Sequence, residues 1–239
     1  MSLRYCHPLA YVDREIRLAP MSPRIEAFRI ETLRGEAMRR RDAAAKRGAD
    51  ILLALAGLTL LAVPMLLVAA LIRLTSQGPA VFGQERIGLN GGPFRMLKFR
   101  TMRHQAELPP CRQATRRDPR VTRFGALLRR TSFDELPQLL NVLAGSMSMV
   151  GPRPHAPGTC VAGRPFEAIT TRYAARHRVK PGMTGLAQVR GWRGETDTDE
   201  KLLHRIDSDL EYIATWSPGR DLLIICGTIV EVLRMRNAY

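Results

Sequence analysis

The sequence predicts a mainly helical α+β fold, that of a monotopic membrane protein with a proline-broken re-entrant helix, a short β-hairpin and surface amphipathic helices. Three observations lead to this prediction. One apolar run is long enough to enter a bilayer, basic residues flank it on both sides, and the remainder mixes helical apolar spacing with turn-rich segments. We expect a polar N-terminal arm and helix over 1–45, the membrane helix over 46–75 and a cytoplasmic domain over 76–239.

The composition indicates a folded chain with an anionic partner. Of 239 residues, 45% are hydrophobic and 25% charged, which excludes disordered and collagen-like proteins. Lys and Arg total 37 and Asp and Glu 22, so the net charge is +15, which suits nucleic acid, anionic lipid or a phosphate-bearing substrate. The four cysteines lack CxxC spacing, so we expect reduced thiols in a cytoplasmic setting rather than a zinc site or a disulfide framework.

The first two segments are an arm and an apolar run. Residues 1–45 are rich in Arg and Glu, and prolines interrupt their first half, so we expect a loose arm followed by one polar helix. The uncharged run over 51–72 would form a helix roughly 33 Å long at about 1.5 Å per residue, enough for a bilayer core. No small-residue cleavage pattern follows the run, so we expect it to be retained rather than removed as a signal peptide.

The flanks of this run bear on its topology. Five Arg or Lys residues lie between 39 and 47, and Arg73 and Arg86 follow the run, so a spanning helix cannot satisfy the positive-inside rule at both ends. Pro64 lies inside the run and cannot donate a backbone hydrogen bond. We therefore expect a membrane break at Pro64 that returns the chain to the face it entered from. An ordinary spanning helix with a mild kink is the open alternative.

A hairpin and a loop are expected next. Apolar residues 80–83 and 94–99 flank the tight-turn sequence Asn90-Gly91-Gly92, which predicts a short β-hairpin. Residues 104–120 are polar, basic and proline-broken, which predicts a loop.

Three helices are expected in the second half. Ser132 followed by Glu135 fits a capping box, and Pro137 is tolerated in a first turn, so we expect a helix to begin there. Apolar residues at helical spacing predict a second helix over 202–216, with Asp197 and Glu200 as capping candidates. The apolar stretch 222–230 is too short to span a bilayer and fits a buried or an interfacial helix.

Asp134 and Glu135 are the first candidates for chemistry. They are adjacent at a predicted helix N-terminus, where the unpaired amides and the helix dipole favour anions such as phosphate. One carboxylate could attack phosphorus while the other holds a hard cation such as Mg²⁺. Most such pairs only cap helices, so the context has to support the catalytic interpretation.

Basic and glycine-rich segments provide that context. Arg153 lies in the rigid turn Gly-Pro-Arg-Pro, and Lys98 and Arg129 lie in two further basic clusters. Taken singly, each is better explained by solvent or lipid headgroup contact. A turn-rich loop over 180–185 leads to Gln188 but lacks Walker spacing. The five histidines show no metal-ligand spacing.

The order of these segments resembles a known family. The proline-broken apolar run is followed by QERIGLNG, KFRTM, LLRRTSFDELPQLLNVL, SMVGPRP, RHRVKPGMTGLAQV, GWRGETDT, WSPGRDL and a terminal NAY. From about residue 46 to 239 the chain resembles the bacterial sugar transferases, which are polyprenyl-phosphate phosphoglycosyltransferases. The resemblance implies a monotopic enzyme of the bacterial inner membrane, with its catalytic domain over 76–239 facing the cytoplasm.

The resemblance also implies a two-step, Mg²⁺-dependent reaction. Asp134 would attack a UDP-sugar, release UMP and carry the phosphosugar, which undecaprenyl phosphate would then remove. Glu135 matches the metal-holding residue and Arg153 a phosphate-binding arginine. Lys98, Arg129 and Gln188 occupy further motif positions.

Finer features of the sequence concern the sugar and the partners. The segments PRPHA, GWRGETDT and NAY look most like the subset that transfers glucose 1-phosphate, whose products start exopolysaccharide or capsule repeat units. Departures from the family pattern are Val63 before the membrane proline, Ser146 and Arg190. The resemblance covers only the catalytic part of the longer family members. We expect anionic inner-membrane lipids as partners, no nucleic acid, and leave a homo-oligomer open.

Two other readings stay open from sequence. A nucleic-acid-binding protein would also carry a charge of +15, although the apolar run argues against it. A membrane-anchored assembly protein could keep the fold without chemistry, although the intact Asp134-Glu135 pair argues against that.

Overall fold

The computed structural model describes residues 40–103, 118–161 and 163–234. The chain divides into two units, Met1–Glu36 and Ala37–Tyr239, and all described residues belong to the second. Most of the predicted arm and polar helix over 1–45, and most of the predicted loop over 104–120, therefore lie outside the described residues.

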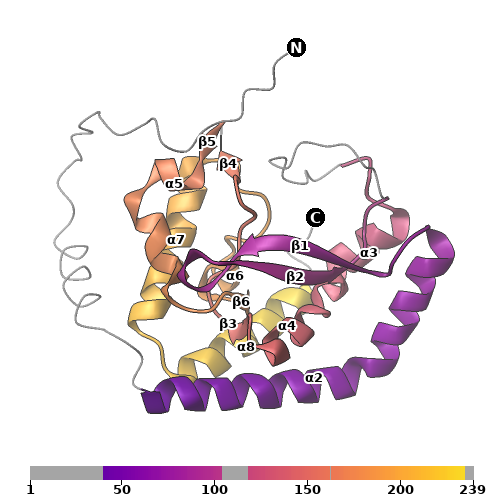
Figure 1. The fold of residues 1–239 in the computed structure, drawn as a ribbon, viewed down its shortest axis with the longest axis horizontal. Helices are drawn as coiled ribbons and strands as arrows, with labels where there is room; N and C mark the ends of the chain where they lie inside the picture. Colours follow the sequence, from indigo (N-terminus) through magenta and orange to yellow (C-terminus); the bar gives the residue numbers. More distant parts are fainter. Residues whose placement is uncertain (1–39, 104–117, 162, 235–239) are drawn as a thin grey trace. The chain divides into compact units, whose positions relative to one another are not determined.

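One long apolar helix, α2 (Arg40–Thr75), contains the predicted membrane segment. It stays helical through Pro64, and Figure 1 shows it changing direction in its C-terminal part. Its most apolar 18-residue window has a mean hydropathy of 2.7, and only 11% of that window is buried. A core helix of a soluble protein would be mostly buried, so the exposed leucines of α2, such as Leu60 and Leu66, suit a lipid environment.

Both halves of α2 pack on the same body. In the N-terminal half, Ala54 is fully buried in a cluster with Leu139 and Met147. In the C-terminal half, Ile72 is 2% exposed and clusters with buried Phe99 and Leu128. The helix is therefore fastened to the rest of the unit on both sides of Pro64.

The predicted hairpin is confirmed and is longer than expected. Strands β1 (Val81–Ile87) and β2 (Pro93–Phe99) pair antiparallel along seven residues each. Their turn contains the 3₁₀ turn η1 (Leu89–Gly91), in which Asn90 has φ 54° and Gly91 φ 77°. Asparagine and glycine tolerate this left-handed conformation, which explains why the Asn-Gly pair marks the turn.

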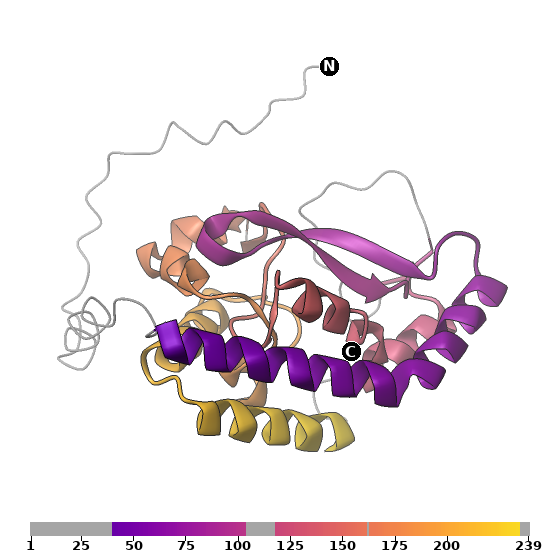
Figure 2. The same ribbon diagram turned by 60° about the horizontal axis from the view of Figure 1, so that its bottom comes forward.

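Three short elements follow: α3 (Arg123–Thr131), η2 (Phe133–Glu135) and α4 (Gln138–Ala144). The predicted capping box is wrong. Ser132 has φ 62° and ends α3, and its side chain makes no cap bond. The Ser-x-x-Glu spacing instead forms a 3₁₀ turn, because the Glu135 amide donates to the Ser132 carbonyl at 3.1 Å. Figure 2 shows α4 lying between the hairpin and α2.

The remaining body is built from short elements and two longer helices. Strand β3 (Ser148–Val150) pairs parallel with β6 (Gly182–Thr184), and β4 (Cys160–Val161) pairs antiparallel with β5 (Arg164–Pro165). Between and after them lie α5 (Phe166–Ile169), η3 (Thr171–Arg178), α6 (Leu186–Val189), α7 (Asp199–Ala214) and α8 (Pro218–Arg234).

The two C-terminal helices differ in burial. The predicted apolar stripe of α7 is confirmed, because Leu202 and Ile206 are fully buried. The cap of α7 is Thr198, whose hydroxyl accepts from the Lys201 amide, rather than Asp197 or Glu200. In α8, Leu222 and Leu223 are 61% and 73% exposed, so this helix presents an apolar surface and fits the interfacial alternative.

Candidate active site

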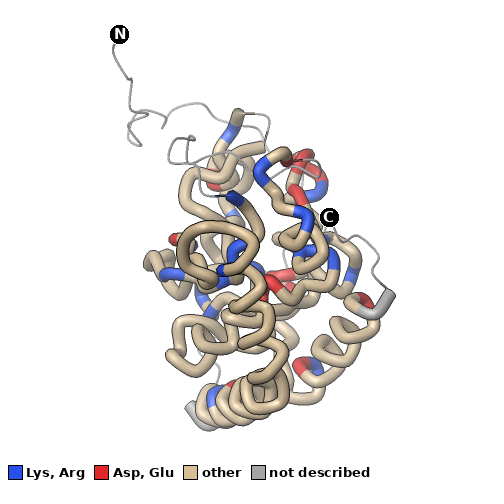
Figure 3. Tube along the Cα trace, turned by 90° about the vertical axis from the view of Figure 1, so that its right-hand side faces the viewer, with Lys and Arg blue, Asp and Glu red and all other residues tan. Residues whose placement is uncertain are grey.

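Asp134 and Glu135 occupy η2, which we call the acidic turn, and not a helix N-terminus. The turn lies between α3 and α4, and both residues are 8% exposed. Figure 3 shows basic segments from several parts of the chain gathered around an acidic segment in the middle of the view. Two adjacent buried carboxylates require nearby positive charge to remain ionised.

Glu135 is held by two cations. Arg153 Nη2 and Nη1 donate to Glu135 Oε1 and Oε2 at 2.5 and 3.2 Å, a bidentate fork. Lys98 Nζ donates to Oε1 at 3.0 Å. Burial acts to raise the pKa of Glu135, but Arg153 and then Lys98 outweigh it and hold that pKa well below its usual value. Glu135 is therefore ionised at neutral pH.

The pKa of Asp134 is shifted in the opposite direction, above its usual value. Burial raises its pKa, Lys98 opposes that rise, and the neighbouring Glu135 charge adds to it. Within the described residues, no hydrogen bond is donated to the Asp134 carboxylate. A carboxylate with poor stabilisation of its charge and no hydrogen-bond donor is more reactive toward an electrophile than one held in a fork.

Strands β1 and β2 supply two of the cations. Lys98 comes from β2, and burial lowers its pKa despite the attraction of Glu135. Arg86 comes from β1, and burial together with the Arg153 charge lowers its pKa to about 10. Sequence reasoning treated Arg86 only as a basic flank of the membrane run. The signal that could have identified it was its place in the strand that pairs with the strand of Lys98, in which Arg86 is opposite Phe94 and Lys98 opposite Phe82.

A buried ion pair supports the turn that carries Arg153. Arg176 of η3 donates to the Arg153 carbonyl at 2.6 Å and pairs with Asp209 of α7 at 2.6 Å. The side chains of this pair are only 2% and 3% exposed. Gly151 allows the close approach of this turn to β6, because a Cβ there would lie 2.6 Å from the Lys180 carbonyl oxygen.

Two further arginines flank the acidic turn. Arg129, a predicted site residue, donates from Nε to Thr101 Oγ1 at 2.9 Å, and its charge lowers the pKa of Asp134. Arg193 was missed as a site residue, although it stands in the GWRGETDT motif. Its Nη2 donates to Ser132 Oγ at 2.5 Å, and its charge lowers the pKa of Glu135.

Gln188 is not joined to this group. It lies on α6, and its Oε1 atom is buried without a hydrogen-bond donor in the described part of the chain. No hydrogen bond among the described residues links Gln188 to Asp134 or Glu135. The structure thus brings together Lys98, Arg129, Arg153 and the acidic turn, and leaves the role of Gln188 as a prediction.

The donor set fits a magnesium ion that takes most of its ligands from elsewhere. Among the described residues, no group of three or more His, Cys, Asp or Glu side chains could hold a metal. Mg²⁺ needs no such cage, because it usually binds one or two carboxylates together with phosphate oxygens and water. The acidic turn supplies two carboxylates, and Glu135 is the one held ionised.

The described part of this site can bind a diphosphate next to a reactive carboxylate. Lys98, Arg86, Arg129, Arg153 and Arg193 surround the turn with positive charge, and arginine forks suit phosphate oxygens. A negatively charged substrate placed there would neutralise the excess cations and bring phosphorus close to Asp134.

Comparisons with known proteins show which family this chain is similar to. Residues 41–235 match the family described as bacterial sugar transferase. A UDP-glucose:undecaprenyl-phosphate glucose-1-phosphate transferase of Caulobacter vibrioides is 53% identical over 81% of this chain and 72% of that protein. The protein of the same name in Escherichia coli is 46% identical over 81% of this chain but only 41% of its own length. An exopolysaccharide production protein of Rhizobium leguminosarum is 49% identical over 83% of this chain and 100% of its own length.

Proposed function

Because the chain belongs to the bacterial sugar transferase family, we propose that it transfers glucose 1-phosphate from UDP-glucose to undecaprenyl phosphate. The product would start the assembly of an exopolysaccharide repeat unit. The observation that carries the proposal is that the two carboxyls of the acidic turn have pKa values shifted in opposite directions. Glu135 is held ionised by Lys98 and Arg153, while the buried Asp134 carboxylate accepts no hydrogen bond from the described residues.

The first step uses Asp134 as the nucleophile. A carboxylate oxygen of Asp134 bonds to the β-phosphorus of UDP-glucose while the bond from that phosphorus to the bridging oxygen breaks. UMP leaves with the bridging oxygen and its electron pair. The enzyme is left with an acyl phosphate that carries glucose. Arg153, Lys98 and Arg193, which bond to Glu135 and Ser132 beside Asp134, would offset the charge that develops on the leaving phosphate.

The second step returns Asp134 to its starting state. A phosphate oxygen of undecaprenyl phosphate bonds to the phosphorus of the acyl phosphate, and the bond from phosphorus to Asp134 breaks. The products are undecaprenyl diphosphate glucose and a free carboxylate. The two substrates use one site in turn, so no site for both at once is required.

Glu135 is the residue we assign to hold Mg²⁺, with substrate phosphates and water as the other ligands. When bound, the ion would neutralise pyrophosphate charge and so favour departure of UMP.

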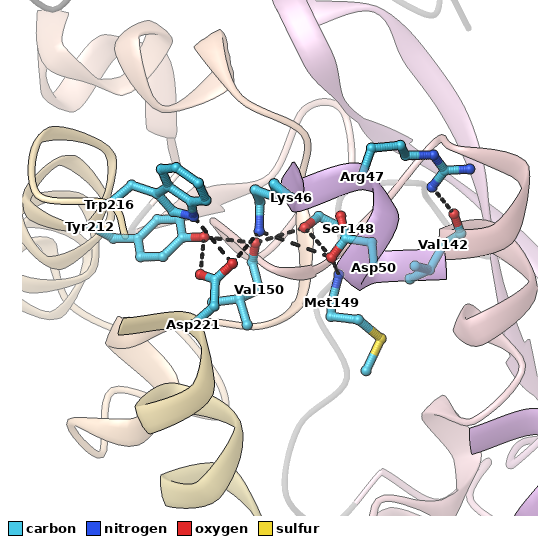
Figure 4. A network of polar contacts seen from close by, with 10 residues as sticks. All are labelled: Lys46, Arg47, Asp50, Val142, Ser148, Met149, Val150, Tyr212, Trp216 and Asp221. Atoms are coloured by element: carbon cyan, nitrogen blue, oxygen red, sulfur yellow. Dashed lines mark hydrogen bonds and ion pairs between the residues drawn. The ribbon is translucent and has the colours of Figure 1, made fainter. Parts of the chain in front are cut away.

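The reaction requires the site to lie near lipid headgroups, and we infer that α2 is re-entrant. Near its start, Lys46 Nζ donates to Asp221 Oδ2 at 2.7 Å, and Asp50 Oδ1 accepts from the Met149 amide at 2.9 Å (Figure 4). Just past its end, Arg100 Nη2 donates to the Ser76 carbonyl at 2.8 Å. A polar body that holds both ends of a helix supports their lying on one face, and the basic flanks favour the cytoplasmic face.

Accessible cysteines test this topology. In a chain whose four native cysteines are replaced, Asp42→Cys and Gln77→Cys would each be labelled by a membrane-impermeant maleimide in inverted inner-membrane vesicles and be protected in spheroplasts. Labelling of the two positions from opposite faces would show a spanning helix and refute the re-entrant topology.

The transfer itself is tested by UMP release and product formation. Purified enzyme with UDP-glucose, Mg²⁺ and undecaprenyl phosphate should form UMP and the glucose diphospholipid, and a panel of other UDP-sugars should react more slowly. Asp134→Asn should abolish both products while membrane association stays normal. Asp207→Asn, which affects an exposed ion pair on α7, is the matched control and should keep full activity. UMP release by Asp134→Asn at the normal rate would exclude Asp134 as the nucleophile.

The same assay distinguishes the transferase from a membrane-anchored assembly protein that has the fold but no transferase activity. Such a protein would bind membranes and release no UMP from any UDP-sugar.

A further inference from the structure

The loop between α6 and α7 reaches the acidic turn through one side chain. Arg193 Nη2 donates to Ser132 Oγ, and Ser132 directly precedes Phe133 of the acidic turn. The loop bends sharply on both sides of Arg193, because Gly191 has φ 86° and Gly194 has φ 89°. Glycine adopts positive and negative φ with similar ease, so these two glycines do little to fix the backbone of the loop. Its conformation therefore depends on contacts with other parts of the chain.

Helix α7 makes such a contact on the C-terminal side of Arg193. Arg205 is 7% exposed, and its Nη2 atom donates to the Gly194 carbonyl at 2.7 Å. Its Nη1 atom donates to Thr196 Oγ1, and Thr196 is 3% exposed. One planar guanidinium thus holds two points of the loop, which a lysine ammonium on a flexible stem cannot reproduce.

The preceding residue of α7 makes a second contact on the N-terminal side of Arg193. The ring of His204 stacks on the ring of Trp192, with centroids 4.4 Å apart and planes 4° apart. His204 is half exposed, with 47% of its side chain accessible. Stacked aromatic rings attract one another beyond the area that they bury, so this contact biases the conformation of a short loop.

We propose that His204 and Arg205 are positioning residues, which clamp the loop 192–196 at its two ends and so fix Arg193 against the acidic turn. They act through Arg193 and need not touch substrate themselves. The inference rests on the proposed function, since it assigns Arg193 a part in the release of UMP. The charge of Arg193 already reaches Glu135, whose pKa it lowers, so a shift of this side chain would change the field in which the pyrophosphate bond breaks.

A double-mutant cycle separates positioning from general structural support. With the full-length enzyme in nanodiscs, Arg205→Lys should lower the kcat of UMP release about tenfold and change KM for UDP-glucose by less than about threefold. Thr196→Val should cause a smaller loss of the same kind. In an Arg193→Ala background, both changes should alter kcat by less than about twofold, because the side chain that they position is gone.

The aromatic contact has its own pair of variants. His204→Ala should lower kcat about fivefold, whereas His204→Phe should restore most of the loss because it keeps a flat ring above Trp192. Asp207→Asn on the same helix is the control, because the ion pair that it breaks is with Arg172 of η3, and it should behave as wild type.

The outcomes distinguish this inference from the proposed function. Failure of the wild-type enzyme to release UMP would overturn the proposed reaction. Normal turnover by wild type together with full-size losses in the Arg193→Ala background would overturn only the clamp. Hydrogen exchange tests the clamp without turnover: backbone amides of 192–196 should exchange at least about tenfold faster in Arg205→Lys than in wild type, and unchanged protection would refute it.

Discussion

At the scale of single residues, the acidic turn places two neighbouring carboxyls under opposite influences. Glu135 is stabilised as an anion by the Arg153 fork and by Lys98, and Asp134 is disfavoured as an anion mainly by burial. This difference supports the proposed division of roles, in which Glu135 holds the ion and Asp134 reacts. The division also has consequences for stability and for pH dependence.

Asp134→Asn should stabilise the folded protein although it abolishes transfer. The folded-state pKa of Asp134 is raised, so above it the buried charge disfavours folding, and this cost disappears as the pH falls below the unfolded value of about 3.9. We expect a gain of about 1 to 2 kcal/mol at pH 7.5, seen as a melting temperature a few degrees higher in detergent. The gain should shrink toward pH 5. A variant that melts below wild type at both pH values would contradict this account of Asp134.

Lys98→Met should move the acid limb of the pH–rate profile to higher pH. In the proposed reaction Asp134 attacks only when ionised, so activity should fall as the pH drops through its pKa. Lys98 lowers the pKa of Asp134 and of Glu135, and its removal raises both. The rate of UMP release at pH 7 should drop at least about tenfold, with partial recovery toward pH 9. Lys201→Met, a change in an exposed pair, should leave the limb in place.

Sequence patterns were informative for part of this site and not for the rest. The adjacency of Asp134 and Glu135 and the rigid Gly-Pro-Arg-Pro turn are local features, so the motifs were enough to make them candidates. The sequence did not indicate the left-handed φ of Ser132, because the spacing of Ser132 and Glu135 also fits a capping box. Its partner Arg193 is 61 residues away along the chain, and no local pattern reports a contact at that separation.

At the scale of elements, α2 is attached to the body by polar contacts that are largely shielded from solvent. Asp221 of α8 accepts hydrogen bonds from Lys46 Nζ at 2.7 Å, from Tyr212 OH at 2.7 Å and from Trp216 Nε1 at 3.1 Å. The side chains of Lys46 and Asp221 are only 11% and 17% exposed. This network, shown in Figure 4, joins the start of the membrane helix to the start of α8.

Asp221→Asn should loosen this attachment. The change removes the nearer negative partner of the shielded Lys46 ammonium and leaves it only Asp50, at 4.0 Å. We expect a loss of about 2 to 4 kcal/mol in the free energy of unfolding, measured in detergent. Asp207→Asn breaks an exposed ion pair and should change stability by less than about 0.5 kcal/mol. Equal effects of the two changes would mean that the network does not hold α2.

Periodicity anticipated the existence of most described elements and placed several boundaries wrongly. The apolar stripe of α7 and the Asn-Gly turn were clear because they depend on local spacing. Thr198 took the capping role expected of Asp197 or Glu200, since Thr and Asp both fit the residue preference of an N-cap. The length of the hairpin depended on cross-strand contacts, which the flanking apolar residues alone did not show.

At the scale of the whole molecule, the charge of +15 and the apolar helix make different predictions for extraction from membranes. In about 1 M salt the Debye length falls to about 3 Å, so contacts that are only electrostatic weaken. Burial of apolar surface does not weaken under these conditions. The protein should therefore stay with sedimented membranes in high salt and enter solution only with detergent. Release by salt alone would instead favour a surface-bound or nucleic-acid-binding protein.

The family and its chemistry could be anticipated from sequence because they rest on ordered local motifs. The way in which the body holds α2 could not, because it depends on residues far apart along the chain, such as Lys46 and Asp221, which are separated by 175 positions. The hydrogen bond from Arg47 to the Val142 carbonyl also joins residues far apart along the chain, 95 positions from each other.

That separation has a consequence for biosynthesis. A ribosome adding about 5 to 20 residues per second makes Lys46 roughly 10 to 35 seconds before Asp221 exists. For most of this interval the apolar helix α2 is complete while Asp221, which later binds Lys46 near its start, is still untranslated. The nascent chain thus needs shelter for α2, in lipid or on an insertion factor, well before its own globular part can supply any.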